Sequence, residues 1–321
     1  YETFSEDAIK TSKILGIVLT QRKNGASASV ELAGFPHHSL DVYLPKLVRA
    51  GLRVAICDQL EDPKQTKTIV KRGVTELVTP GVSFNSQILE SNENNFLAAI
   101  HFSKDILGAA FLDVSTGEFF VAEGPKYYIE KLIAGFNPSE ILFERGQKAN
   151  YEELFGNKYH TYHLEDWAFQ HEFAYEALTR QFKTQSLKGF GVEEHFHAII
   201  AAGAALHYVS ETQHDRIHHI SQLSRIDGND HVWLDRFTQR NLELFSTSNQ
   251  GGKSLLAIID KTITPMGSRL MKQWLAFPLN NIDSINQRLK SVAVFFDNQE
   301  IRQSLIDQLK KIGDLDRKSV V

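Results

Sequence analysis

Two carboxylates flank a short turn and could together bind metal ions. Asp113 ends an apolar run, and Glu118 follows the turn Ser115-Thr116-Gly117. A carboxylate that ends the first strand of a hairpin is how ribonuclease H-like nucleases begin a two-metal site, and Glu140 and Asp166 could supply further ligands. The same residues also fit an ordinary Asp/Ser/Gly turn with solvated charges. We favour the turn and keep a metal-dependent nuclease as an alternative.

Two other patterns resemble ligand sites but are incomplete. Gly251-Gly252-Lys253-Ser254 resembles the end of a phosphate-binding loop, yet Thr247 stands where that loop needs its first glycine. We therefore interpret this segment as the start of a helix. The 13 histidines include dense spots at His37-His38, His195-Phe196-His197 and His218-His219. No cysteine or converging carboxylate completes a site beside them, so we expect no metal and no cofactor in this chain.

Basic residues gather in the predicted loops of the N-terminal region: Arg22, Lys23, Lys64, Lys67, Lys71 and Arg72. Scattered surface charge is the usual explanation for such residues. Their placement near glycines is also compatible with contacts to phosphates. The net charge of −4 gives no global basic field, so any contact with nucleic acid must come from local patches.

Composition indicates a globular protein of two or three domains. The 321 residues are 42% hydrophobic and 23% charged, which is ordinary for a globular chain. The single cysteine, Cys57, excludes a disulfide within the chain, and we expect it to be buried in a strand. No apolar run approaches the ~18 residues of a membrane span, so we expect no membrane contact. The first residues do not resemble a signal peptide.

Residues 1–80 predict a small mixed α/β domain. Apolar residues at helical spacing from Phe4 to Leu15 indicate a helix that ends at Gly16. A second helix is expected over 39–50, although Pro45 removes a helical N–H and the helix could begin near Leu44. Strands are expected at 17–20, 30–33, 52–57 and 68–79. The turn Thr79-Pro80-Gly81 ends this domain, and we interpret the polar stretch 81–95 as a linker.

Residues 96–217 predict a second α/β domain, and residues 218–321 predict an all-α segment. Antiparallel strands are expected at 96–102, 107–113 and 118–121, followed by a helix over 127–134 and another strand near 141–143. In the third region Thr264 is the expected N-cap of a helix, with Pro265 at its first position. We therefore expect an α/β multidomain fold that ends in helices.

Several segments, in order and at matching spacing, resemble the MutS mismatch-repair family over essentially the whole chain. Tyr1-Glu2-Thr3-Phe4 resembles the continuation of the family's Gly-Asp-Phe-Tyr-Glu motif, and residues 33–38 resemble its Ala-Gly-Ile/Val-Pro-Tyr/His-His turn. Further matches lie at 54–59, 78–81, 112–119, 137–142, 234–235, 240–244, 264–269 and 274–275 with Pro278. Pro45 and Leu32 stand where family members often carry other residues.

The resemblance implies a mismatch-reading domain at 1–80, a ribonuclease H-like connector at 96–217, and a truncated helical core at 218–321. It implies a clamp and an ATPase domain beyond this chain, so ATP or ADP with Mg²⁺ would be bound by the longer protein, and the chain itself would be no enzyme. It also implies a cytoplasmic, nucleoid-associated bacterial protein. Its dimer would encircle and bend DNA and then recruit the MutL protein, whereas the chain alone could remain monomeric.

The resemblance further implies that duplex DNA with mismatched or unpaired bases is recognised by an aromatic wedge in the minor groove. The family's wedge is the Phe before Tyr1, so the chain begins one residue after it, and Glu2 is the glutamate two positions beyond it. We expect the DNA-binding residues to be Tyr1, Glu2, Arg22, Lys23, Leu32, Lys71 and Arg72. Without the wedge, the chain should hold DNA weakly and discriminate poorly. A nuclease based on Asp113 and Glu118, or a module that only docks proteins, remains an alternative.

Overall fold

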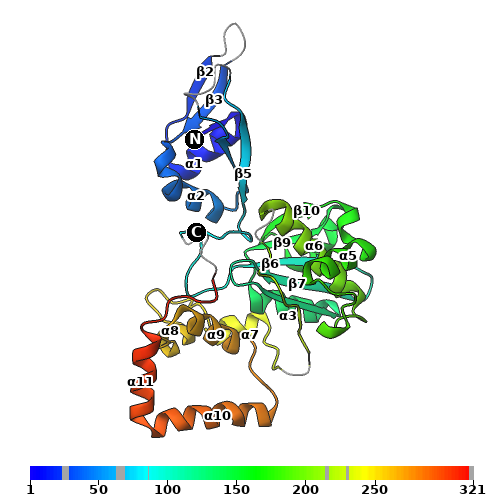
Figure 1. Ribbon diagram of the computed structural model, residues 1–321, viewed down its shortest axis with the longest axis vertical. Helices are drawn as coiled ribbons and strands as arrows, with labels where there is room; N and C mark the ends of the chain where they lie inside the picture. The colour runs from blue at the N-terminus through cyan, green and yellow to red at the C-terminus, as the bar shows by residue number, and fades with distance from the viewer. Residues whose placement is uncertain (24–28, 63–68, 86, 214–216, 229–230, 318–321) are drawn as a thin grey trace. The chain divides into compact units, whose positions relative to one another are not determined.

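The computed structural model describes residues 1–23, 29–62, 69–85, 87–213, 217–228 and 231–317. Lys64 and Lys67, two of the basic residues considered above, lie outside these ranges. The chain divides into two compact units, Tyr1–Leu89 and Glu90–Val321. Figure 1 labels many of the elements of both units.

The first unit contains a three-stranded sheet, a two-stranded ribbon and helices α1 and α2 (Figure 1). The sheet has the order β1-β3-β2 with antiparallel pairs, and β4 and β5 form a separate antiparallel ribbon. Leu44, Val48, Ile56, Val78 and Ile88 form a buried apolar cluster. The elements are β1 (Glu2–Phe4), α1 (Ser5–Leu15), β2 (Thr20–Lys23), β3 (Ser29–Gly34), η1 (His37–Ser39), α2 (Leu40–Arg49), β4 (Val54–Gln59) and β5 (Arg72–Val78).

The sequence predicted both helices of the first unit, but not all of their ends. Gly16 adopts the left-handed conformation, φ +68°, and its N–H donates to the Ser12 carbonyl, so α1 ends as predicted. Phe4 lies in β1 and not on the helix. The suggestion that the second helix begins near Leu44 is wrong, because α2 begins at Leu40 and contains Pro45. Proline removes one N–H but its φ is helical, and here its ring is buried on the packed face of the helix.

Cys57 is exposed, which corrects the expectation that it would be buried. In a strand, successive side chains point to opposite faces. The β4–β5 ribbon buries Ile56 on one face and leaves Cys57 on the other. The pairing register also shifts between these two residues, as at a β-bulge.

The second unit is built on a six-stranded sheet in the order β10-β9-β6-β7-β8-β11. The pairs β6–β7 and β7–β8 are antiparallel, and the other pairs are parallel. The strands are β6 (Phe96–His101), β7 (Leu107–Asp113), β8 (Glu118–Gly124), β9 (Glu140–Glu144), β10 (His160–Leu164) and β11 (Ser224–Arg225). Because β11 lies within 218–321, that region is not purely helical as expected. Two extended residues suffice to add a parallel partner to β8.

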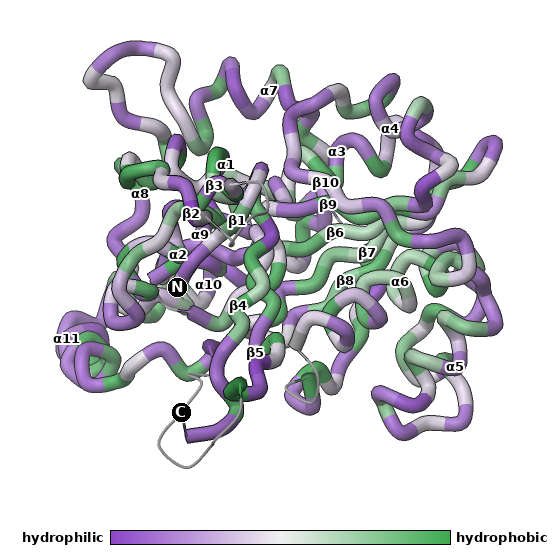
Figure 2. The backbone as a smooth tube through the Cα atoms, turned by 90° about the horizontal axis from the view of Figure 1, so that it is seen from above, coloured by the Kyte–Doolittle hydropathy of each residue, from purple (hydrophilic) through white to green (hydrophobic). Residues whose placement is uncertain are grey.

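Helices and short 3₁₀ turns connect and cover this sheet: α3 (Lys126–Phe136), η2 (Arg145–Gln147), α4 (Lys148–Phe155), η3 (Asp166–Phe169), α5 (His171–Phe182), η4 (Lys188–Phe190) and α6 (Phe196–Gln213). Helix α6 packs across β6, β7 and β8. Its Ala198, Ala201, Ala202 and Ala205 are buried, and such small side chains let a helix lie close to a sheet. Figure 2 shows the central strands and α6 in the hydrophobic colours.

The remainder of the second unit is helical, with α7 (Arg236–Asn241), α8 (Leu255–Ile259), α9 (Pro265–Ala276), α10 (Ile282–Asp297) and α11 (Gln299–Leu309). The predicted start of α9 is confirmed, because the Thr264 side chain accepts a hydrogen bond from the Gly267 N–H and Pro265 is the first helical residue. Ala276 and Phe277 join the core beneath the sheet, which fixes the end of α9 to that core.

Candidate nucleic-acid interface

Glu2 lies on β1, a three-residue strand at the edge of the sheet. Its side chain is 51% exposed, and its Oε2 lies 3.7 Å from Arg22 Nη1 on β2. Opposite Glu2 stands Gly34, where an added Cβ would lie 2.7 Å from the Tyr1 carbonyl oxygen. Only glycine therefore lets β1 approach β3 this closely. The carboxylate is thus accessible and lies near a cation.

Tyr1, directly before β1, contacts the side chains of Asp58 and His37, and Asp58 links it to Thr75. Its hydroxyl donates to Asp58 Oδ1 at 2.7 Å, and its ring stacks on His37 with 5.1 Å between ring centroids. The other carboxylate oxygen of Asp58 accepts from Thr75 Oγ1 at 2.9 Å. Burial, followed by the bond to Asp58, raises the pKa of Tyr1 to about 12. The hydrogen bond from Tyr1 is the main cause that lowers the pKa of Asp58.

The basic residues predicted to contact phosphates were expected in loops, but some of them lie on strands. Arg22 and Lys23 lie on β2, and Arg72 is the first residue of β5, because hairpin strands here continue into the basic stretches. Of Lys23 only the backbone is described. Arg22 faces Glu2, while Lys71 Nζ lies 3.5 Å from Glu61 Oε1 with its own side chain 79% exposed.

The remaining two predicted residues differ in exposure. Arg72 is exposed, and its Nη1 makes a long contact of 3.4 Å with the Val70 carbonyl oxygen. Leu32 lies in the central strand β3, between Phe4 of β1 and Thr20 of β2, and is half-buried. The structure therefore places Glu2, Arg22 and Leu32 on one sheet, with Tyr1 directly before its strand β1, whereas Arg72 begins a strand of the ribbon and Lys71 precedes it.

The carboxylates of the alternative nuclease site are already occupied by protein donors. Asp113 is fully buried and accepts hydrogen bonds from Asn94 Nδ2, the Asn95 N–H, and both the N–H and Oγ of Ser115. Glu118 Oε2 accepts from Asn94 Nδ2 at 2.7 Å. Burial and then the Asp113 charge raise the pKa of Glu118. These contacts favour a structural role, in which the hairpin anchors the segment before β6.

Further ligands suggested for that site are engaged elsewhere or lie apart. Glu140 is buried on β9 and accepts from the Tyr208 hydroxyl at 2.7 Å. Asp166 begins η3 after β10. Among the residues that the structure describes, no cluster of three or more His, Cys, Asp or Glu side chains is arranged to hold a metal ion.

The segment before β6 is also clamped by the helical part of the same unit. Arg269 on α9, with a side chain only 3% exposed, donates through Nη1 to the Ser91 carbonyl and to Asp314, and through Nη2 to Asp314 and Asp316. Arg317 donates to the carbonyls of Glu90 and Glu93. The stretch interpreted from sequence as a linker therefore has ordered partners at this end.

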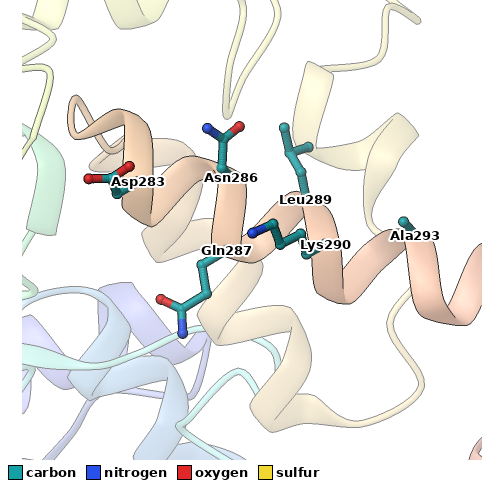
Figure 3. Close-up of a pocket in the computed structure, with 6 residues that line it drawn as sticks. All are labelled: Asp283, Asn286, Gln287, Leu289, Lys290 and Ala293. Carbon is teal, nitrogen blue, oxygen red and sulfur yellow. The ribbon is translucent and has the colours of Figure 1, made fainter.

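Two ligand-like patterns have structural explanations. Ser254, at the end of the sequence that resembles a phosphate loop, caps α8 by accepting from the Ala257 N–H at 3.2 Å, which confirms a helix start. A hollow beside α10 is lined by Asp283, Asn286, Gln287, Leu289, Lys290 and Ala293. Figure 3 shows that these side chains fan out from a single helix, so they do not converge on a ligand.

Several histidines of the second unit contact other parts of the same unit. His219 Nε2 contacts the Val114 carbonyl oxygen at 2.6 Å, and His195 Nε2 lies 2.9 Å from Arg225 Nη1. His101 and His197 stack with 5.2 Å between ring centroids, and the Nδ1 atom of each is buried without a hydrogen-bond partner. Burial, followed by the charge of His197, lowers the pKa of His101 from 6.5 to about 4.

Acidification should therefore weaken the second unit through His101. Because its folded pKa lies below its unfolded value of 6.5, the unfolded chain binds the extra proton. The stabilisation is complete above pH 6.5 and is lost as pH falls toward 4. After discounting for solvent access, the expected loss is roughly 1–2 kcal/mol. Urea unfolding at pH 7 and pH 4.5 would measure this loss of stability. It should be smaller in His101→Phe than in the unsubstituted chain, because phenylalanine keeps a ring but cannot titrate. Equal losses in both proteins would contradict this assignment.

Comparisons with known proteins match one family, MutS, along nearly the whole chain. The family models described as MutS domain I, MutS domain II and MutS domain III match residues 1–87, 95–221 and 237–319. The DNA mismatch repair proteins MutS of Cytophaga hutchinsonii and Flavobacterium psychrophilum are each 58% identical over 317 residues. That of Bacteroides fragilis is 56% identical over the same length. Each alignment covers 99% of this chain and 37% of the relative.

The chain thus spans little more than a third of the length of these relatives. Within the described residues, no helix combines the length and the apolar character needed to cross a bilayer.

Proposed function

Because the chain belongs to the MutS family of DNA mismatch repair proteins, we propose that its first unit reads duplex DNA for mismatched or unpaired bases. The observation that supports this best is the accessible carboxylate of Glu2 on an edge strand, beside Arg22. Phosphates repel a carboxylate, so one on a surface that binds DNA needs a specific role, such as a hydrogen bond to a displaced base. The family motif places an aromatic residue directly before Tyr1, next to this carboxylate.

A mismatch differs from a paired duplex mainly in stacking and stiffness. An aromatic side chain inserted from the minor groove tests this difference, because unstacking costs less at a mispair. The duplex bends when the wedge enters, and bending brings more backbone within reach of the protein. Recognition therefore depends more on how easily the base step unstacks than on which bases form it.

Glu2 would contribute in two ways at the opened step. An ionised carboxylate can accept a hydrogen bond from the N3–H of a displaced thymine. A purine N7 is itself an acceptor, so Glu2 would need to be protonated to donate to it, and surrounding phosphates favour that protonation. Against an intact duplex, the same charge is repelled without compensation, which lowers affinity for paired DNA.

Cations of the first unit would supply affinity that does not depend on sequence. Arg22, Lys71 and Arg72 are exposed, and we propose that they and Lys23 contact the phosphates of bent DNA. Arg22 would exchange its contact with Glu2 for a phosphate when DNA binds. Leu32, half-buried in β3, would support the strand that carries the site.

The rest of the proposed function concerns the longer protein. The strand order β8-β7-β6-β9-β10, with β7 antiparallel to its neighbours, supports a ribonuclease H-like connector. We propose that this connector binds the MutL repair protein. Dimerisation around DNA, and an ATPase that uses ATP or ADP with Mg²⁺, would belong to the longer protein, which would act in the bacterial cytoplasm at the nucleoid.

The test is the affinity for a duplex with one unpaired thymine compared with the matched duplex, measured by fluorescence anisotropy. The chain should bind both weakly and with little preference. The same chain preceded by Gly-Asp-Phe should prefer the unpaired base. Equal discrimination by both proteins would refute the wedge. Cleavage of labelled duplex in Mg²⁺ or Mn²⁺, lost in Asp113→Asn, would instead establish the nuclease.

In the chain preceded by Gly-Asp-Phe, replacing Arg72 with alanine should weaken binding to both duplexes by a similar factor. A phosphate contact carries no sequence information, so its loss lowers affinity uniformly and reduces the slope of log K against log salt by about 1. Titrations between 50 and 200 mM salt would measure both effects. The exposed Lys126→Ala on α3 is a control of equal charge change. A loss of mismatch preference alone would show that Arg72 reads the base step.

A further inference from the structure

Three separated segments of the first unit are linked around Tyr1 and Asp58, and the proposed function does not account for this arrangement. His37 follows the Gly34-Phe35-Pro36 turn, Asp58 ends the apolar run of β4, and Thr75 lies on β5. Each contacts Tyr1 directly or through Asp58. The carboxylate of Asp58 thus joins the hydroxyls of Tyr1 and Thr75, one at each oxygen.

We propose that Tyr1, held by Asp58, is a positioning residue that fixes β1 so that the Glu2 carboxylate is presented at one defined place. The inference rests on the proposed function of Glu2 and identifies what holds its carboxylate in position for DNA. Successive side chains of an extended strand point to opposite faces. Anchoring the Tyr1 side chain inward therefore leaves the Glu2 side chain outward, as its 51% exposure shows.

The strand needs such an anchor because its own pairing is short. β1 has three residues and one partner strand, and isolated short edges fray readily. The backbone of Tyr1 exchanges two hydrogen bonds with Phe35, at 2.8 and 3.0 Å. The side chain adds a link to β4, which belongs to a different sheet. Gly34 completes the arrangement by letting β1 lie against β3.

The hydroxyl is suited to a permanent link. With its pKa raised to about 12 by burial and by Asp58, Tyr1 keeps its proton at every physiological pH and remains a donor. Asp58 accepts without changing charge, because its own pKa is lowered by the same bond. Tyr1 and Asp58 therefore act as structure around Glu2, and neither needs to touch a base.

The first experiment uses the chain without DNA. The hydrogen-exchange rate of the Thr3 amide, followed by NMR, should rise about five-fold in Tyr1→Phe and in Asp58→Ala, while β2 amides change little. Asp58→Asn keeps an oxygen that accepts from the hydroxyl and should restore slow exchange. Tyr43→Phe is the matched control, because the Tyr43 ring packs on Phe35 in the same aromatic group. Unchanged exchange in Tyr1→Phe overturns the proposal.

The second experiment measures the ratio of affinities for the unpaired-thymine and matched duplexes, with Gly-Asp-Phe preceding Tyr1. Tyr1→Phe should lower the ratio about five-fold and leave matched-duplex affinity unchanged. In a Glu2→Ala background, Tyr1→Phe should not change the affinity ratio further. Equal weakening on both duplexes, or an undiminished effect without Glu2, overturns the positioning role. If the unsubstituted protein shows no preference while the exchange effect holds, the proposed function fails and the anchoring of β1 stands.

Discussion

Replacing Gly108 with alanine is expected to destabilise the second unit by about 3 kcal/mol or more. Gly108 lies on β7 beneath the first turn of α6. A Cβ there would fall 1.9 Å from the His197 carbonyl oxygen, 2.1 Å from its carbon and 2.7 Å from the Ala198 nitrogen. All three are backbone atoms, so no flexible side chain can move aside. The helix itself must shift away from the sheet.

That shift would also break the cap of α6. Gly108 is the cross-strand partner of Glu123, whose Oε2 accepts from the N–H groups of His197 and Ala198. Glycine lets the helix approach, and the glutamate beside it satisfies two N–H groups that have no partner within the helix. Glu123→Ala should therefore cost only about 1 kcal/mol, since it removes the cap and leaves the packing.

Urea unfolding followed by circular dichroism would measure these free energies. The control is Gly146→Ala, because a Cβ at Gly146 meets nothing within 4 Å. It should change stability by less than about 0.5 kcal/mol. A loss in Gly108→Ala no larger than in Gly146→Ala would show that α6 can move freely on the sheet.

Short-range features of this fold were predictable because their causes lie within a few residues. The N-cap Thr264 with Pro265, and the left-handed Gly16, each act on the adjacent helical turn. The main strands of the second unit were predictable from runs of apolar residues between turns. The exposure of Cys57 was not, because alternation assigns residues to two faces but does not say which face the unit covers.

The candidate site was predictable in part, for a related reason. The resemblance to a family motif pointed to Tyr1 and Glu2, and charge alone pointed to Arg22. What holds them could not be seen, because the hydrogen bond from Tyr1 to Asp58 spans 57 positions in the chain. The pairing of Glu2 with Arg22 depends on β1 and β2 flanking the same strand. Likewise, Asp113 was a candidate metal ligand until its donors, Asn94 and Asn95, were located.

Arg269→Ala is expected to cost the second unit about 3 kcal/mol. The guanidinium is buried and bidentate to Asp314, with N–O distances of 2.7 and 2.8 Å, and it also binds the carbonyl of Ser91. Removing it leaves a carboxylate that is only 22% exposed without its partner. Lys272→Ala is the control on the same helix, because Lys272 pairs with Glu93 at 3.0 Å in a more exposed setting. Its cost should be at most about 1 kcal/mol.

The acid dependence of stability separates this ion pair from simple loss of packing. The hydrogen bond from Arg269 is the main cause that lowers the pKa of Asp314. A carboxylate with a lowered folded pKa contributes stability above its unfolded pKa of about 3.9, and that contribution disappears as pH falls through the folded value. Arg269→Ala should therefore be less sensitive than the unsubstituted chain to acidification below pH 4. In a double-mutant cycle with Asp314→Ala, the double variant should lose about 1–2 kcal/mol less stability than the sum of the two single losses. Additive losses would mean that Arg269 stabilises the unit through Ser91 and packing alone, with the charge of Asp314 contributing nothing.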